Sequence, residues 1–227
     1  MAEEHVQRDY SAPTAEEMHT LRNTKELYKS NLFKLQIDEL LKEITIRWSR
    51  LGPLERYLHK LREVLLAMPT KSVSAEENSI VLGVPMRRKT VQMKVGAPAR
   101  VDLVGSFLLH TTLKAGENIA KPCVDVAVEI PASSGLLEKD YLNYRYFNKR
   151  ALYLHHVAEY LKGQDVLPIG SSIKVQCLHH DPLKPVLVLR PPHSKAYGSE
   201  ASSACANFTI RIIPCLATDA FAPRKLG

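Results

Sequence analysis

The chain has 227 residues, of which 45% are hydrophobic and 24% charged, and it carries a formal net charge of +7 at pH 7. This composition is that of an ordinary folded domain with room for helical extensions, and it excludes global disorder and collagen-like repeats. No run of about 18 apolar residues occurs, so we expect no membrane-spanning helix, and the acidic first residues predict no secretory signal.

The positive charge is concentrated in the first half of the chain. Residues 18–100 hold sixteen basic and eight acidic side chains, whereas residues 1–17 hold one basic and five acidic ones. A basic surface attracts phosphate backbones without reading sequence. Charge alone leaves two interpretations open, a contact with nucleic acid and a solvated helix face that keeps the chain soluble.

The cysteines and histidines predict neither a metal site nor a cofactor. No two of the four cysteines form a C-x-x-C pair, which argues against a zinc ribbon or a redox motif. The histidines at 155–156 and 179–180 are sequence neighbours, and neighbouring side chains point apart on a helix or a strand. With no secretory signal, disulfides are not expected either.

Two amphipathic helices are predicted at the N-terminal end. Thr14 and Glu17 have the spacing of a capping box, and apolar residues recur at helical spacing after them. We expect a helix from about Thr14 to Arg50, with a break within it left open, and a second helix from Gly52-Pro53 to Pro69. Core packing is the favoured interpretation of both apolar stripes: Phe33, Ile37, Leu40, Leu41, Ile44 and Trp48, then Leu54, Leu58, Leu61 and Leu65.

The rest of the chain predicts an α+β fold with a mixed sheet. Residues 70–79 have the composition of a polar linker, and residues 191–206 that of a loop. Cys123 to Ile130 is apolar enough for a strand covered on both faces, and Val91, Met93 and Val95 alternate with polar residues. Strands are expected at 80–84, 90–95, 101–104, 123–130, 173–178, 186–190 and 207–213, the last stopped by Pro214, with helices at 107–113 and 138–161.

These elements give four expected parts: a disordered N-terminus at 1–13, a helical extension at 14–69, a mixed-sheet domain at 80–218 and an extended tail at 219–227. The tail has no closing element. The chain therefore has the character of the first piece of something larger, or of a truncated product.

One group of residues has the pattern of a phosphate- and metal-binding site. Val104-Gly105-Ser106 closes a predicted strand and opens a helix, and Asp125 follows on an apolar strand. A Gly-Ser turn at a helix start offers backbone N–H groups and a hydroxyl to phosphate. A strand with Asp-x-Asp presents two carboxylates to two magnesium ions for phosphoryl or nucleotidyl transfer. This is the layout of a nucleotidyltransferase (polymerase-β-like) fold.

The set of acidic residues that such a two-metal centre needs is incomplete in this sequence. Ala127 stands where the second carboxylate belongs, and Glu129 is four residues past Asp125, about 13 Å along a strand. The last strand, which should supply a third acid, offers Thr209 and Arg211. Because one carboxylate does not hold two metals, we interpret Gly105, Ser106 and Asp125 as a vestigial framework. Structural roles are favoured for two of them, a tight turn for Gly105 and a helix cap for Ser106.

These residues together resemble the nucleolar RNA-associated protein (Nrap) family, whose members are large ribosome-assembly factors of the small-subunit processome. The likeness covers most of residues 13–218. It rests on residues 14–17 and 35–43, on Val104 to Leu109 and Val124 to Ala127, and on residues 138–154 and 183–191.

The resemblance implies a tandem of nucleotidyltransferase-like domains without their catalytic acids, of which this chain holds the N-terminal portion with the first. It implies a non-catalytic scaffold in the nucleus and nucleolus that binds pre-ribosomal RNA and other processome proteins, with no membrane and no cofactor. If the surface meets RNA, phosphate contacts should come from exposed cations. The candidates are Arg87, Arg88 and Lys89, between two strands, and Lys149 and Arg150, on the long helix.

Two alternatives stay open. The first is an active metal-dependent nucleotidyltransferase acting on RNA with displaced acids such as Asp102 or Glu129. The second is a purely protein-binding module in which the N-terminal helices hold a partner.

Overall fold

The computed structural model describes residues 12–29, 31–86, 90–114, 121–163, 171–190, 207–217 and 220–221. By its internal contacts the chain divides into two units, Met1–Thr45 and Ile46–Gly227. The predicted loop 191–206, the N-terminus before residue 12 and most of the tail lie outside the described residues.

The first unit consists of two helices, α1 (Ala15–Lys29) and α2 (Asn31–Ile44). The predicted capping box is confirmed, because the Thr14 amide donates to Glu17 Oε2 at 2.7 Å and the Glu17 amide donates to Thr14 Oγ1 at 3.3 Å. The expected helix to Arg50 is interrupted after Ile44, and a short 3-10 turn, η1 (Trp48–Arg50), follows in the second unit.

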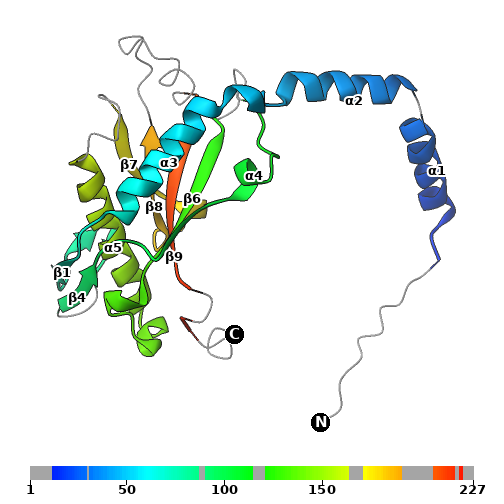
Figure 1. Cartoon of the computed structure of the whole chain (residues 1–227). Coiled ribbons are helices and arrows are strands. Elements are labelled where there is room, and N and C mark those ends of the chain that lie inside the picture. The colour runs from blue at the N-terminus through cyan, green and yellow to red at the C-terminus, as the bar shows by residue number, and fades with distance from the viewer. Residues whose placement is uncertain are drawn as a thin grey trace. The chain divides into compact units, whose positions relative to one another are not determined.

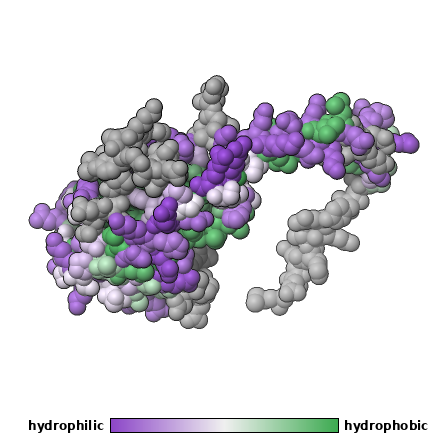
Figure 2. Space-filling view, turned by 45° about the horizontal axis from the view of Figure 1, so that its top comes forward, coloured by the Kyte–Doolittle hydropathy of each residue, from purple (hydrophilic) through white to green (hydrophobic). Residues whose placement is uncertain are grey.

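The expected core packing of the first apolar stripe holds for its last residue, Trp48, which follows α2 and packs against the core of the second unit, but not for the residues of α2 itself. No residue of α2 is buried. Most of the stability of a helix comes from packing its apolar face, and α2 buries no side chain fully. Figure 2 shows hydrophobic side chains standing among hydrophilic ones on the N-terminal helices; the exposed ones on α2 are Leu32, Leu35, Ile37, Leu40 and Leu41.

The second unit begins with α3 (Gly52–Leu66), whose first turn contains Pro53 as predicted. Its leucine stripe is buried as expected, at Leu54, Leu58, Leu61 and Leu65. These contacts group α3 with the second unit, whereas the sequence pattern placed it with the helical extension at 14–69.

Two small antiparallel ribbons follow, and the predicted linker is one of their strands. β1 (Lys71–Glu76) pairs with β4 (Thr90–Val95), because Val73 and Ala75 alternate with polar residues inside a hydrophilic stretch. The predicted strand at 80–84 is instead a tight hairpin of β2 (Ile80–Val81) and β3 (Val84–Pro85). Leu82 and Gly83 form its turn, both at positive φ (51° and 84°), as a two-residue hairpin loop requires. The alternation in β4 is confirmed, since Val91, Met93 and Val95 are buried.

A five-stranded mixed sheet, in the order β5-β6-β9-β8-β7, forms the main layer of this unit (Figure 1). β6 and β9 are parallel, and the other neighbouring pairs are antiparallel. Its strands are β5 (Arg100–Val104), β6 (Cys123–Glu129), β7 (Ser172–Cys177), β8 (Pro185–Arg190) and β9 (Thr209–Cys215). The mixed α+β class and the hairpin of β7 and β8 are therefore confirmed.

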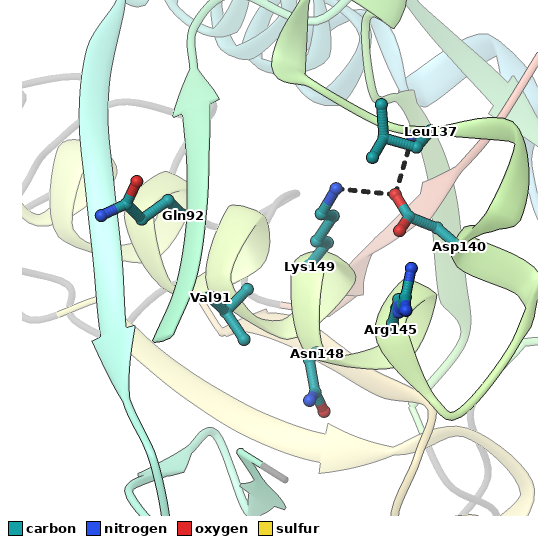
Figure 3. Close-up of a pocket in the computed structure, with 7 residues that line it drawn as sticks. All are labelled: Val91, Gln92, Leu137, Asp140, Arg145, Asn148 and Lys149. Atoms are coloured by element: carbon teal, nitrogen blue, oxygen red, sulfur yellow. Dashed lines mark hydrogen bonds and ion pairs between the residues drawn. The ribbon is translucent and has the colours of Figure 1, made fainter. Parts of the chain in front are cut away.

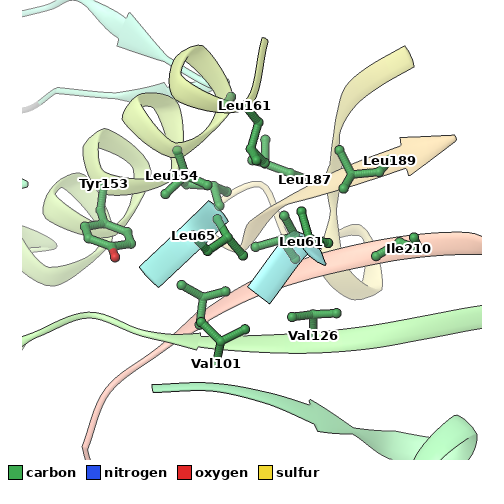
Figure 4. Packing of buried hydrophobic residues seen from close by; sticks show 14 of the residues in the cluster. Leu61, Leu65, Val101, Val126, Tyr153, Leu154, Leu161, Leu187, Leu189 and Ile210 are labelled. Carbon is green, nitrogen blue, oxygen red and sulfur yellow. The ribbon is translucent and has the colours of Figure 1, made fainter. Parts of the chain in front are cut away.

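Only one face of β6 is fully buried, which corrects the expectation of a strand covered on both sides. The buried face belongs to a core cluster that also contains Leu61 and Leu65 of α3 and Leu154 and Leu161 of α5 (Arg145–Lys162) (Figure 4). The opposite face is half-exposed, and it carries Asp125.

Two predicted helices are shorter than expected. α4 covers only Gly105–Leu108 and ends before His110, which has a positive φ of 56°. α5 begins at Arg145 because Asn143 and Tyr144, both at positive φ, separate it from the 3-10 turn η3 (Glu138–Tyr141). Left-handed residues cannot continue a right-handed helix. Two further 3-10 turns are η2 (Ala132–Ser134) and η4 (Leu178–His180).

Pro214 does not stop the last strand, as the sequence had indicated, but lies inside β9 opposite Val128. The pairing of β9 with β8 covers only Ile210 to Ile212. Pro214 therefore has a neighbouring strand on one side only, and a proline without an N–H is tolerated at such an edge.

Candidate functional site

The structure brings together the glycine turn and the acid that the sequence singled out. β5 ends at Val104, which lies directly opposite Asp125 of β6. Gly105 then turns the chain with φ of +75°, and a Cβ at this position would lie 3.0 Å from Asp125 Oδ2. Glycine is thus favoured at position 105 for two reasons: the backbone has a positive φ, and the neighbouring carboxylate leaves little room for a Cβ.

Asp125 is held by an arginine. Arg211 lies opposite Asp125 in the parallel pairing of β6 and β9. Its Nε donates to Asp125 Oδ1 at 2.6 Å and its Nη2 donates to Oδ2 at 2.8 Å. This hydrogen bonding raises the pKa of Arg211 above its ordinary value. Both carboxylate oxygens are thus occupied by one guanidinium in a bidentate, charge-assisted pair.

The other acids on this face are arranged differently. Asp102 lies opposite Ala127 and so shares a face with Asp125, and its carboxylate bonds Arg100 Nη2 at 2.8 Å. Glu129 lies opposite Arg100, at the far end of the pairing. Across the described part of the chain, no three His, Cys, Asp or Glu side chains gather into a group that could hold a metal ion.

Ser106 does not cap a helix, contrary to the expectation. It lies inside the four-residue α4, where its Oγ accepts a hydrogen bond of 2.9 Å from Thr112 Oγ1. The Ser106 carbonyl accepts the Thr111 amide at 2.9 Å. These bonds close the chain after the glycine turn, so the hydroxyl has a structural role here.

Cys123 stands two residues before Asp125 on the same face of β6. Burial raises its pKa to about 11, and the nearby Asp125 adds to this while Arg211 opposes it. At neutral pH the free thiol therefore stays protonated, so it is not present as a thiolate nucleophile.

The structure describes two of the five predicted basic contacts, Lys149 and Arg150. Arg87, Arg88 and Lys89 lie outside the described residues. Lys149 is 12% exposed, and its Nζ bonds Asp140 Oδ2 and the Gly135 carbonyl, both at 2.6 Å. Lys149 therefore lies at the surface only in part.

Arg150 corrects the prediction of an exposed cation. It is 4% exposed, and its guanidinium donates to the carbonyls of Pro214 and Leu183, both at 3.4 Å. Burial lowers its pKa. Arg150 thus ties α5 to β9 and to the loop before β8, because its position on α5 falls on the inner side of the helix.

Sequence reasoning noted Arg211 only as a residue that is not an acid. Its pairing with Asp125 depends on the register of two strands 86 residues apart, and no local signal announces that register. A cation among alternating apolar residues was the one available hint.

Among the described residues, none of the helices combines the length and the apolar character that a membrane span needs.

Fold and site together define a mixed α+β protein in which a turn-and-carboxylate framework is closed by an arginine. Residues 56–227 match the family described as Nrap protein domain 1, and the chain belongs to this Nrap family. The family predicted from the sequence is therefore confirmed.

Three relatives show how far the similarity extends. The chain is 34% identical to Nucleolar protein 6 of Mus musculus and of Homo sapiens, over 96% of this chain and 18% of each relative. It is 31% identical to U3 small nucleolar RNA-associated protein 22 of Saccharomyces cerevisiae, over 95% of this chain and 18% of that protein. The chain thus spans about a fifth of the length of these relatives. Their names confirm the predicted nuclear, nucleolar location.

Proposed function

We propose that this chain is a degenerate nucleotidyltransferase-like domain that serves as a non-catalytic scaffold in ribosome biogenesis. In this role it binds pre-ribosomal RNA and assembly factors of the small-subunit processome. The names of the relatives, which refer to the nucleolus and to a small nucleolar RNA, support this setting.

The observation that carries the non-catalytic part is the pair of Asp125 and Arg211. A two-metal centre needs converging carboxylates with free oxygens. Here the second position is Ala127, and an arginine stands on the strand that should supply the third acid. A guanidinium that fills both oxygens of Asp125 also repels a divalent cation. The arrangement favours a framework that keeps its shape without joining phosphates.

The test is an assay of nucleotide addition to a labelled RNA oligonucleotide, with Mg²⁺ or Mn²⁺ and each of the four nucleoside triphosphates. We expect no extension by the full chain, while the same preparation binds RNA in a filter assay. Arg211→Ala should not create activity, because Ala127 still occupies the position of the second carboxylate and β9 still supplies no acid. Arg100→Ala, which removes the arginine from the Asp102 pair, is the matched control.

Extension that disappears in Asp125→Ala would overturn the proposal. It would favour the alternative of an active enzyme with displaced acids. The position of Asp102 beside Ala127, on the face of Asp125, is the feature that such an enzyme would use.

A protein-binding role for the N-terminal helices is a second candidate. It is favoured by the exposed leucines of α2, since a helix that buries none of its apolar stripe gains little stability in isolation. Both roles are compatible within one chain, with RNA held by the second unit and a partner held by the first.

A further inference from the structure

The outer face of the ribbon of β1 and β4 is polar, and Ser133 of the short turn η2 borders it. In the antiparallel register, Ser72 lies opposite Lys94 and Ser74 lies opposite Gln92. All four side chains are exposed, because the alternate residues of both strands turn inward toward the core. The face therefore presents two hydroxyls, an amide and an ammonium side by side.

Two adjoining hollows border this face. The first, of about 580 Å³, lies over the ribbon and is bounded on the other side by Ser133 and Gly135. The second, of about 440 Å³, lies between β4 and the first turns of α5, where Arg145, Asn148 and Lys149 line it (Figure 3). Gln92 lines both hollows. The two together are called the ribbon groove below.

Lys149 connects the walls of the ribbon groove. Its Nζ bonds the Gly135 carbonyl, beside the first hollow, and Asp140 Oδ2, beside the second, both at 2.6 Å. Asp140 is 1% exposed, and the same oxygen also accepts the Leu137 amide at 2.7 Å. The bonds drawn in Figure 3 therefore fix this wall before any ligand arrives.

The charge of the ribbon groove is positive. Its lining contains Lys94, Arg145 and Lys149, and Asp140 is the single acid among the described lining residues. That acid is buried and paired with Lys149, so the remaining two cations are not balanced from within the lining. A ligand that enters meets an electropositive, hydroxyl-rich surface.

Unused hydrogen-bonding groups lie at the α5 end of the ribbon groove. Both polar atoms of the Asn148 amide are buried without a partner in the described structure, and so is Nε of Arg145. Asn148 itself is 1% exposed. An unpaired buried polar group is costly, and both Asn148 and Arg145 are among the residues that line the second hollow.

We propose that the ribbon groove binds the sugar–phosphate backbone of single-stranded RNA; this proposal rests on the RNA-binding function proposed above. Phosphate and sugar oxygens are recognised by Lys, Arg, Ser and Gln side chains, which are the residue types on this surface. Positive charge in a groove that tracks the backbone is the usual arrangement for single strands. The match is electrostatic, so the groove holds RNA without selecting its sequence.

The test measures binding of the full chain to a short, labelled single-stranded oligouridylate by fluorescence anisotropy at several salt concentrations. Lys94→Glu should weaken binding about tenfold and reduce the slope of log K against log salt by about 0.7, the value expected when one phosphate of a single strand is no longer neutralised. Gln92→Glu should weaken binding in the same direction. The matched control is Lys174→Glu, an exposed lysine on β7 outside the groove, which should leave affinity and slope within about twofold of the wild type.

The possible outcomes distinguish a failure of the ribbon-groove proposal from a failure of the scaffold proposal. If the chain binds RNA but Lys94→Glu binds it as tightly as Lys174→Glu does, the ribbon groove is not the RNA-binding site, and the scaffold proposal stands. If the wild type binds no RNA, both are overturned. An acidic peptide of equal charge that displaces the oligouridylate equally well would reduce the groove to general charge attraction and also contradict the proposal. Circular dichroism of each variant checks that the fold is intact.

Discussion

At the scale of single residues, the most informative feature is the contact between Gly105 and Asp125. Two glycines of the second unit share nearly the same left-handed backbone, Gly105 at φ +75° and Gly135 at φ +79°. They differ in what surrounds them: a Cβ at Gly105 would lie 3.0 Å from Asp125 Oδ2, whereas a Cβ at Gly135 would meet nothing within 4 Å. This pair separates backbone strain from steric crowding.

We expect Gly135→Ala to lower the free energy of unfolding by about 1 kcal/mol, the cost of a left-handed alanine. Gly105→Ala should lower it by about 1–2 kcal/mol more, because the methyl group also displaces Asp125 from Arg211. Urea unfolding followed by circular dichroism measures both losses. Equal losses in the two variants would show that the Asp125 side chain moves aside without a cost in free energy. That result would contradict a rigid ion pair between Asp125 and Arg211.

At the scale of elements, α3 joins the sheet through its leucine stripe. Leu61 is 1% exposed, while Leu66, five residues on, is 41% exposed. The two leucines therefore give a buried and an exposed position on one helix, with the same substitution available at each.

Leu61→Ala should lower the free energy of unfolding by about 2–5 kcal/mol, since it removes buried methyl groups and leaves a cavity. Leu66→Ala should change it by at most about 0.5 kcal/mol. Thermal or urea unfolding measures the difference. A loss below about 1 kcal/mol for Leu61→Ala would mean that α3 is not an integral part of this core.

At the scale of the whole molecule, the residues of the hydrophobic core all lie at or after Ile46. A chain that lacks residues 1–45 should therefore unfold cooperatively with a midpoint within a few degrees of the full chain. It should also keep its affinity for RNA, because the ribbon groove belongs entirely to the second unit.

The same truncation tests the role of the N-terminal helices. If α2 holds a protein partner, a nuclear-extract pull-down with the shortened chain should lose protein partners that the full chain retains. Substituting Leu35 and Leu41 by Asn in the full chain should produce the same loss, while Lys42→Gln, on the same helix, should not. Loss of folding on truncation would contradict the division into two units.

The patterns that depend on neighbours in the chain were predictable from the sequence. The capping box at Thr14, the buried leucines of α3 and the alternation of β4 follow from local periodicity and hydrogen bonding, and all three appear in the structure. The Gly105 turn beside Asp125 was also predictable, since it needs only two adjacent strands. The family, too, was identified correctly, from a resemblance carried by segments such as Val104 to Leu109 and Val124 to Ala127.

Only the tertiary structure decided the features that depend on register and on what covers each face. Polar residues 71–76 become a strand because β4 is available to pair with them, and Arg150 turns inward because Pro214 of β9 and Leu183 before β8 offer carbonyls there. Arg211 meets Asp125 through a parallel pairing that no local pattern encodes. Such contacts arise between segments far apart in the chain, where the free energy of pairing belongs to the assembled sheet and not to either strand alone.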